Sequence, residues 1–291
     1  METLNKYRLL TDNFIDNLSK ENIVPKKFKE ALFYTPKSGG KRIRALLTFS
    51  SAEMFNADID KVVFVAAAIE LIHAYSLIHD DLPAMDNDDF RRGKPSNHKV
   101  FGEDMAILAG DGLNTHAFNV IADSPLMPEQ KIEIIKHLSK AAGIYGMVNG
   151  QAADILSSGA DVGKNQQKKL VNFIHKHKTA KLIQSSVVCG ALCGRNIKDT
   201  DFNKISKYGL YIGVAFQIID DCLDIVGDEK LLGKKKVDEI NNTLTYPKIY
   251  GLERSYKMAE VLKNMAFNEI KDMKKSENLI NIAKLVVERK Q

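Results

Sequence analysis

The residues from 61 to 82 constrain this chain most, because the run is apolar nearly all round and helical in composition. A helix that is hydrophobic on every face lies in the core of a large protein or crosses a membrane. Glu70 and His73 interrupt its most apolar part, residues 62–78, which is also short for a membrane span. The run therefore predicts a buried central helix, which Pro83 ends or kinks.

Helical spacing recurs elsewhere in the chain. Apolar residues three and four positions apart follow one another through 166–191 and through 204–225. No sustained apolar and polar alternation is present, so few strands are expected. The turn signals between these segments are too short to be domain linkers. We therefore predict an all-α protein with a single domain over residues 1–291, a helical bundle of roughly ten or more helices.

Charge and cysteine content limit the class of protein. The net charge is +5, and lysine and arginine are spread along the chain without a basic stripe or interleaved aromatic residues, so no nucleic-acid partner is expected. Cys189, Cys193 and Cys222 are too few and odd in number for a disulfide framework, which favours a reducing compartment. The N-terminus is broken by charges and shows no signal peptide. These features predict a cytoplasmic protein without a membrane span.

Two aspartate-rich motifs each follow an apolar segment. The second contains Asp220, Asp221 and Asp224, and the first and last of these share a helix face because they are four residues apart. Carboxylates this close repel each other unless a cation lies between them. Hard oxygen ligands favour Mg²⁺, which typically bridges to substrate phosphates. An acidic cluster on a solvated helix surface is the alternative for this motif taken alone.

The first motif contains Asp80, Asp81 and Asp86 at the end of the apolar run. A turn after the helix is expected to fold Asp86 back towards Asp80, and Arg91 and Arg92 follow a few residues later. Metal ions would neutralise some oxygens of a diphosphate, and arginine forks would bind others. Taken together, the two motifs predict a magnesium-dependent diphosphate site.

A glycine-containing segment at 38–44, SGGKRIR, adds positive charge. Its two glycines let the backbone turn tightly and approach a ligand, and a helix is expected to start there. Lys41 and Arg44 are three residues apart, so we expect them on one face of that helix. Weaker candidates for binding an anion are Lys178, Thr179, Gln217 and Lys234.

These segments, in this order, resemble the short-chain polyprenyl diphosphate synthase family. The likeness runs from about residue 30 to residue 255 of the sequence. The spacing within the first aspartate motif is most similar to that of the bacterial farnesyl diphosphate synthases. The segments that carry the resemblance are 38–44, 73–111, 146–155, 177–182 and 216–234.

The resemblance implies an all-α homodimer of the isoprenoid synthase type, with its active site in a deep central cavity. The metal ligands for Mg²⁺ would be Asp80, Asp86 and Asp220, supported by Asp81, Asp221 and Asp224. Isopentenyl diphosphate would be bound by Lys41, Arg44, His73 and Arg92. The allylic diphosphate would be bound by Arg91, Lys178, Thr179, Gln217 and Lys234. The residues implied to be catalytic are Asp80, Asp86, Lys178 and Asp220.

The implied reaction condenses isopentenyl diphosphate with dimethylallyl or geranyl diphosphate. Tyr75 lies five residues before Asp80, about 7.5 Å along the helix axis. Together with Ser76, its ring would stop the growing chain at farnesyl diphosphate and not at geranylgeranyl diphosphate. The alternative for Tyr75 is a core residue without this role.

Several positions depart from the family pattern. Ala45 stands where the family usually has proline, and Ala180 where it usually has glycine. Thr243 replaces a lysine, and the loop at 234–247 is one residue shorter. A missing cation there could lower activity or alter lid closure.

Three other functions are alternatives to farnesyl diphosphate synthesis. A geranylgeranyl diphosphate synthase differs only in product length. A class I terpene cyclase needs no second diphosphate site, so the basic residues expected to bind isopentenyl diphosphate argue against it. A catalytically weak regulatory subunit typically lacks one aspartate motif, and this chain has both.

Overall fold

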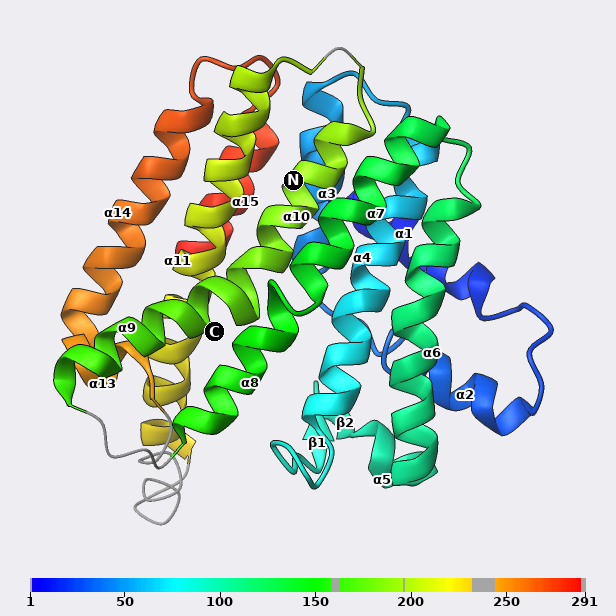
Figure 1. The fold of residues 1–291 in the computed structure, drawn as a ribbon, viewed down its shortest axis with the longest axis horizontal. Helices are drawn as coiled ribbons and strands as arrows, with labels where there is room; N and C mark the ends of the chain where they lie inside the picture. The colour runs from blue at the N-terminus through cyan, green and yellow to red at the C-terminus, as the bar shows by residue number, and fades with distance from the viewer. Residues whose placement is uncertain (1, 159–162, 196, 232–243, 289–291) are drawn as a thin grey trace. The chain divides into compact units, whose positions relative to one another are not determined.

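The computed structural model describes residues 2–158, 163–195, 197–231 and 244–288, of which 227–231 are described by their backbone alone (Figure 1). Within these residues the chain is helical apart from one small hairpin, which confirms the all-α prediction. The elements are α1 (Glu2–Leu18), α2 (Lys26–Tyr34), α3 (Ile43–Met54), α4 (Ile59–Asp80), β1 (Phe90–Arg91), β2 (Lys94–Pro95), α5 (Asn97–Phe101), α6 (Glu103–Ala122), α7 (Pro128–Ala142), α8 (Met147–Ser157), α9 (Lys164–Ile174), the π-helix η1 (His175–Ala180), α10 (Lys181–Leu192), α11 (Asp199–Leu231), α13 (Tyr246–Tyr250), α14 (Leu252–Ile270) and α15 (Glu277–Val287).

The chain divides into two compact units, which are described separately below. Unit 1 comprises Met1–Lys136 together with Cys189–Asn196, and unit 2 comprises His137–Val188 together with Ile197–Gln291. Two of the three boundaries between the units fall inside helices, at α7 and α10. A single domain over residues 1–291 stays a prediction.

The helix α4 is the predicted central helix, and it lies in the core of unit 1. It packs against α3 and α6, which run beside it in Figure 1. The Asp58 side chain accepts a hydrogen bond from the N–H of Asp60 at 3.2 Å and so caps the N-terminus of the helix. By length and composition α4 alone among the described helices could cross a membrane, but 67% of its most apolar window is buried inside the protein. It is therefore a core helix here.

The segment 166–191, in which the apolar residues have helical spacing, lies within α9, η1 and α10, which follow one another directly. Two glycines let neighbouring helices approach the π-helix closely. A Cβ atom at Gly150 of α8 would lie 2.0 Å from the backbone nitrogen of Lys178, and one at Gly213 of α11 would lie 2.5 Å from Cα of Ala180. No larger residue fits at either position without moving η1, so these contacts fix where Lys178 and Thr179 lie in unit 2.

The turn after the first aspartate motif leads into the hairpin of β1 and β2. The two strands are antiparallel, and the pairs are Phe90 with Pro95 and Arg91 with Lys94. The two turn residues, Arg92 and Gly93, have φ angles of 54° and 74°. Positive φ at both positions matches the twist of a tight two-residue hairpin, so the hairpin aims consecutive arginines in different directions.

The three cysteines are buried and free, as expected from their number. Burial raises the pKa of the Cys222 thiol to about 11, with the charge of Asp221 adding to the effect. Burial also raises the pKa of Cys193 far above its usual value. These thiols are therefore neutral at physiological pH and pack as small apolar groups.

Candidate active site

The first aspartate motif turns the chain back on itself directly after α4. The N–H of Asp86 donates to the carbonyl oxygen of Asp80 at 2.8 Å, and the N–H of Asn87 donates to that of Leu82 at 3.1 Å. The predicted return of Asp86 towards Asp80 is therefore present in the backbone. The Asp80 side chain is half-buried and that of Asp86 is exposed, so both carboxylates remain accessible to a ligand.

Asp81 orients the first of the two arginines. Arg91 donates from Nε to Oδ1 of Asp81 at 2.8 Å, and its Nη2 donates to the same oxygen and to Oδ2 of Asp88 at 3.0 Å. Burial raises the pKa of Asp81, and Arg91 partly offsets that effect. Arg91 is therefore bound to the first aspartate motif. That motif is where a metal-bound diphosphate is expected to bind.

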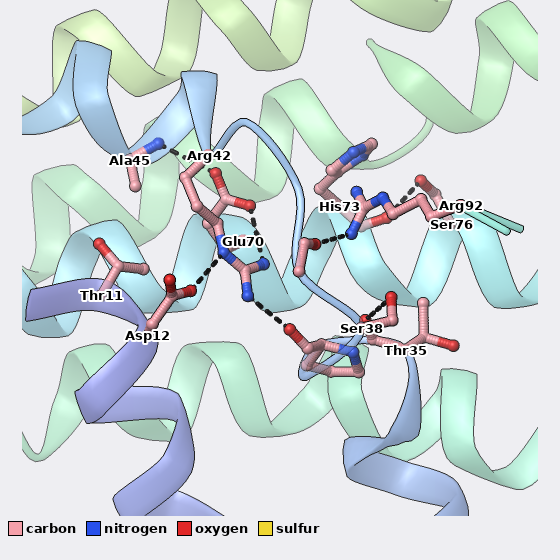
Figure 2. Close-up of polar contacts among 12 residues, drawn as sticks. Thr11, Asp12, Thr35, Ser38, Arg42, Ala45, Glu70, His73, Ser76 and Arg92 are labelled. Carbon is pink, nitrogen blue, oxygen red and sulfur yellow. Dashed lines mark hydrogen bonds and ion pairs between the residues drawn. The ribbon is translucent and has the colours of Figure 1, made fainter. Parts of the chain in front are cut away.

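Arg92 is bound instead by the glycine-containing segment 38–44, called the glycine loop below. Its Nη1 donates to the carbonyl of Gly39, and Figure 2 shows its guanidinium beside His73. Gly40 has a φ of +132°, and a Cβ atom there would lie 2.9 Å from the guanidinium carbon of Arg92. The sequence had predicted close approach of these glycines to a ligand, and the structure shows that they approach Arg92.

The prediction that Lys41 and Arg44 share a helix face is wrong. Helix α3 begins at Ile43, so Lys41 lies in the loop before it. Between the two lies Arg42, whose φ of 50° is left-handed and breaks the helical path. Arg42 was not among the predicted site residues. The signal that could have found it was Glu70, a charged residue inside an apolar helix that required a buried partner.

His73 lies within an electropositive cluster in unit 1. Burial lowers the pKa of its imidazole well below the usual range, and the nearby cations Arg44, Arg92, Arg42 and Arg91 lower it further. The imidazole is therefore neutral at pH 7. A neutral ring among several guanidinium groups gives a strong positive potential, which attracts phosphate groups.

Tyr75 and Ser76 lie on α4, a few residues before the first aspartate motif in the sequence. Tyr75 is 7% exposed, and its ring meets that of His79 edge to face at 5.9 Å. Burial and the charge of Asp80 raise the pKa of Tyr75 to about 12, so it stays protonated. The Ser76 hydroxyl donates to the carbonyl of His73 at 2.9 Å, within its own helix.

In unit 2 the π-helix presents Lys178 and Thr179. Nζ of Lys178 lies 2.6 Å from Oδ2 of Asp154 on α8. The Thr179 hydroxyl donates to Oε1 of Gln217 on α11 at 2.5 Å. Of the residues predicted to bind the allylic diphosphate, Thr179 and Gln217 are thus hydrogen-bonded to each other, and Lys178 is paired with a carboxylate.

The second aspartate motif lies on α11, and its three aspartates differ in how far they are buried. Asp221 is buried, and its carboxylate accepts from Gln217 Nε2 at 2.9 Å and from the N–H of Tyr246 at 2.8 Å, and pairs with His175 Nε2 at 2.9 Å. Asp220 is half-buried and Asp224 is exposed. The predicted support of a metal ion by Asp221 is therefore indirect at most in this arrangement, because protein groups already bind both of its oxygens.

The donors available for magnesium are carboxylates. Across the described part of the chain, no three His, Cys, Asp or Glu side chains form a preformed metal cage. Mg²⁺ commonly binds one or two carboxylates and completes its shell with waters and substrate phosphates, and the accessible Asp80, Asp86 and Asp220 have the oxygen chemistry for this. Lys234 and Thr243 lie outside the described residues.

Known proteins share both the sequence and the fold. The sequence model of the polyprenyl synthetase family matches residues 25–283. A farnesyl diphosphate synthase of Geobacillus stearothermophilus is 48% identical over 233 residues, which are 78% of this chain and 76% of that protein. The large subunit of a heterodimeric chloroplastic geranylgeranyl pyrophosphate synthase from Arabidopsis thaliana is 44% identical over 84% of this chain and 67% of its own.

A solved structure extends the similarity to nearly the whole chain. The geranyltransferase of Helicobacter pylori, in complex with magnesium and isoprenyl diphosphate, superposes with a TM-score of 0.84 at 29% identity. The match covers 99% of this chain and 98% of that one.

Proposed function

Because this chain belongs to the polyprenyl synthetase family, we propose that it condenses isopentenyl diphosphate with dimethylallyl and geranyl diphosphate to give farnesyl diphosphate. The observation that carries the proposal is the divergence of two consecutive arginines. Arg91 is bound by the aspartate motif through Asp81, whereas Arg92 is bound by the glycine loop beside His73. Two separately held cations support two diphosphate subsites, which a condensation of two diphosphate esters requires and a terpene cyclase does not.

In this mechanism the residues of the chain bind and orient the two substrates. Arg91, Lys178, Thr179 and Gln217 hydrogen-bond the allylic diphosphate, while Lys41, Arg44, His73 and Arg92 hold isopentenyl diphosphate. Mg²⁺ bound through Asp80, Asp86 and Asp220 would supply Lewis acidity that stabilises charge on the departing diphosphate. Lys234 is a further proposed contact of the allylic diphosphate.

The reaction needs no side-chain nucleophile. The C–O bond of the allylic ester breaks, and its electron pair leaves with the diphosphate. The double bond of isopentenyl diphosphate attacks the resulting allylic cation and forms the new C–C bond. The released diphosphate accepts the proton that is then lost. Lys178 and Arg91 contribute by stabilising negative charge as it develops, which is where preformed hydrogen-bond donors have their largest effect.

The C15 product is proposed on the basis of Tyr75. Its bulky side chain is buried on α4 close enough to Asp80 to feel that charge, so it would block a chain that grows along the helix. The Geobacillus relative is a farnesyl diphosphate synthase, which favours the same product. Geranylgeranyl diphosphate is the alternative, favoured by the Arabidopsis relative.

The test is a product assay. The purified protein is incubated with labelled isopentenyl diphosphate, dimethylallyl diphosphate and Mg²⁺, with EDTA in a parallel sample, and the dephosphorylated alcohols are separated by length. We expect magnesium-dependent farnesol. Longer alcohols would retain the condensation but contradict the role of Tyr75, and an absence of elongation by folded protein would contradict the proposed function.

We also propose that the protein is a cytoplasmic homodimer of single-domain subunits. Helix α6 exposes Ile107 and Leu108 by 46% and 49%, and Val100 of α5 is 44% exposed. Exposed apolar side chains on these two helices support an interaction between copies of the chain. Light scattering coupled to size-exclusion chromatography tests this, and a monomeric mass would contradict it.

A further inference from the structure

Arg42 is a buried cation in the loop before α3 of unit 1. Its side chain is 4% exposed, and three acceptors from other segments surround it (Figure 2). Nε donates to Oδ1 of Asp12 at 2.8 Å, Nη1 to Oε2 of Glu70 at 3.5 Å and Nη2 to the carbonyl of Pro36 at 2.6 Å. The Glu70 side chain is itself 3% exposed. Because both charges are removed from water, each depends on the other for compensation.

These contacts determine the backbone of the loop. Arg42 has a φ of 50°, a left-handed conformation that is uncommon for a residue with a side chain. Such conformations persist when the surroundings fix them. The chain changes direction at Arg42, and α3 starts at the next residue. The side-chain anchors therefore set the direction in which Lys41 leaves the loop.

The second oxygen of Glu70 caps α3. The N-cap residue Arg42 makes no side-chain cap hydrogen bond, and the N–H of Ala45 in the first turn instead donates to Oε1 of Glu70 at 3.1 Å. A carboxylate is favoured at this end of a helix because the free N–H groups carry partial positive charge. Proline, which the resemblance leads one to expect at residue 45, has no N–H and could not make this bond.

The other end of the loop is held by Arg92. Its Nη1 donates to the carbonyl of Gly39, and Gly40 leaves no space for a Cβ beside the guanidinium. Lys41 thus lies between two anchored points, Gly40 on one side and Arg42 on the other. Burial lowers the pKa of Arg92, and the charge of Glu70 is the main effect that counters it.

We propose that Glu70 is a positioning residue for the diphosphate of isopentenyl diphosphate. It acts through Arg42 and the N–H of Ala45, which together fix the loop that carries Lys41. Glu70 does not touch the substrate, and it determines where the cations that bind the substrate are placed. The identity of the ligand rests on the proposed function above.

The test compares two variants that break different contacts of Glu70. E70Q keeps the size of the side chain and an oxygen for the Ala45 N–H but removes the charge that faces Arg42. A45P removes the N–H donor, at a position in the first helical turn where proline is tolerated. For E70Q we expect the KM for isopentenyl diphosphate to rise about tenfold, with kcat within about threefold and the KM for geranyl diphosphate unchanged. A45P should also raise the KM for isopentenyl diphosphate, but by less than E70Q does.

V65A is the matched control, because Val65 is a fully buried apolar residue of the same helix that carries no hydrogen-bonding side chain. It should lower the melting temperature without changing the KM for isopentenyl diphosphate. If E70Q and A45P lower only the melting temperature, or raise both KM values equally, Glu70 has a merely structural role and the proposal is wrong.

A calorimetric titration separates this inference from the proposed function. If the wild-type protein binds isopentenyl diphosphate but shows no turnover, the proposed function fails, and weaker binding by E70Q than by V65A still supports the positioning role. If the wild-type protein does not bind isopentenyl diphosphate at all, both are contradicted.

Discussion

Nζ of Lys178 lies 2.6 Å from Oδ2 of Asp154, so a carboxylate of α8 pairs with a cation that the proposed mechanism assigns to the departing diphosphate. The two side chains are 27% and 19% exposed. The ion pair therefore remains reachable from solvent, and a diphosphate can exchange with the carboxylate. Asp154 orients Lys178 when no diphosphate is bound.

Replacement of Lys178 by glutamine should lower kcat about 100-fold, because the lysine stabilises charge that develops only in the transition state. The KM for the allylic substrate should change much less. D154N serves as the comparison and should keep kcat within about threefold, because it leaves the cation in place. Steady-state kinetics with geranyl diphosphate measures both. A K178Q variant with a raised KM and an unchanged kcat would show that the lysine only binds the ground state.

Replacement of Gly150 by alanine should destabilise unit 2, because a Cβ atom there would lie 2.0 Å from the backbone of Lys178. We expect the free energy of unfolding to fall by about 1–3 kcal/mol or more, as in other overpacked positions. Replacement of the adjacent exposed Asn149 by alanine should change it by less than about 0.5 kcal/mol. Urea denaturation measures both, and equal stabilities for the two variants would argue against the close packing of α8 on η1.

Replacement of Tyr75 by alanine should lengthen the product. The ring is buried on α4, and its removal opens space of the kind that a longer prenyl chain needs. Y75F is the control, since it keeps the ring and should still yield C15. Chromatography of the dephosphorylated alcohols reports the outcome. An unchanged C15 product from Y75A would mean that Tyr75 is a core residue without a role in chain length.

Stability should fall in mildly acidic solution partly because of His73. Its pKa is held well below the usual range in the folded state, first by burial and then by Arg44 and Arg92. In the unfolded chain the group has an ordinary pKa of about 6.5. Below that pH the unfolded chain binds a proton that the folded protein does not, so the free energy of unfolding decreases as the pH falls.

The variant H73Q isolates this effect. Urea denaturation of both proteins between about pH 7.5 and pH 5.5 should show a smaller loss of stability for H73Q than for the wild type. Equal losses would mean that His73 is protonated in the folded state and is not surrounded by cations as described.

Periodicity was sufficient to predict the helices, because a stripe of apolar residues reports directly which face is buried. The run 61–82, which is apolar nearly all round, predicted α4, and Pro83 marked the end of that helix; the periodicity correctly placed α11. It missed η1, because a π-helix changes the hydrogen-bond pattern while the apolar spacing on either side remains helical. The interruption is visible in the structure as the π-helix over His175–Ala180.

The site was less predictable where contacts join residues distant in the sequence. Arg42 and Glu70 are 28 positions apart, and nothing in either segment alone shows that they pair. The prediction for Lys41 failed for this reason, since it assumed that the helix continued through Arg42. The roles assigned to the aspartates rest on motif chemistry and stay predictions.

The most direct test of the central claim measures diphosphate release and carbon incorporation in the same sample. Geranyl diphosphate is added to the protein with Mg²⁺, first alone and then with labelled isopentenyl diphosphate. The account predicts little release from geranyl diphosphate alone, and release of one diphosphate for each isopentenyl unit incorporated once both substrates are present. Equal release with and without isopentenyl diphosphate would contradict it, because that result describes a cyclase or a hydrolase and not a condensing enzyme.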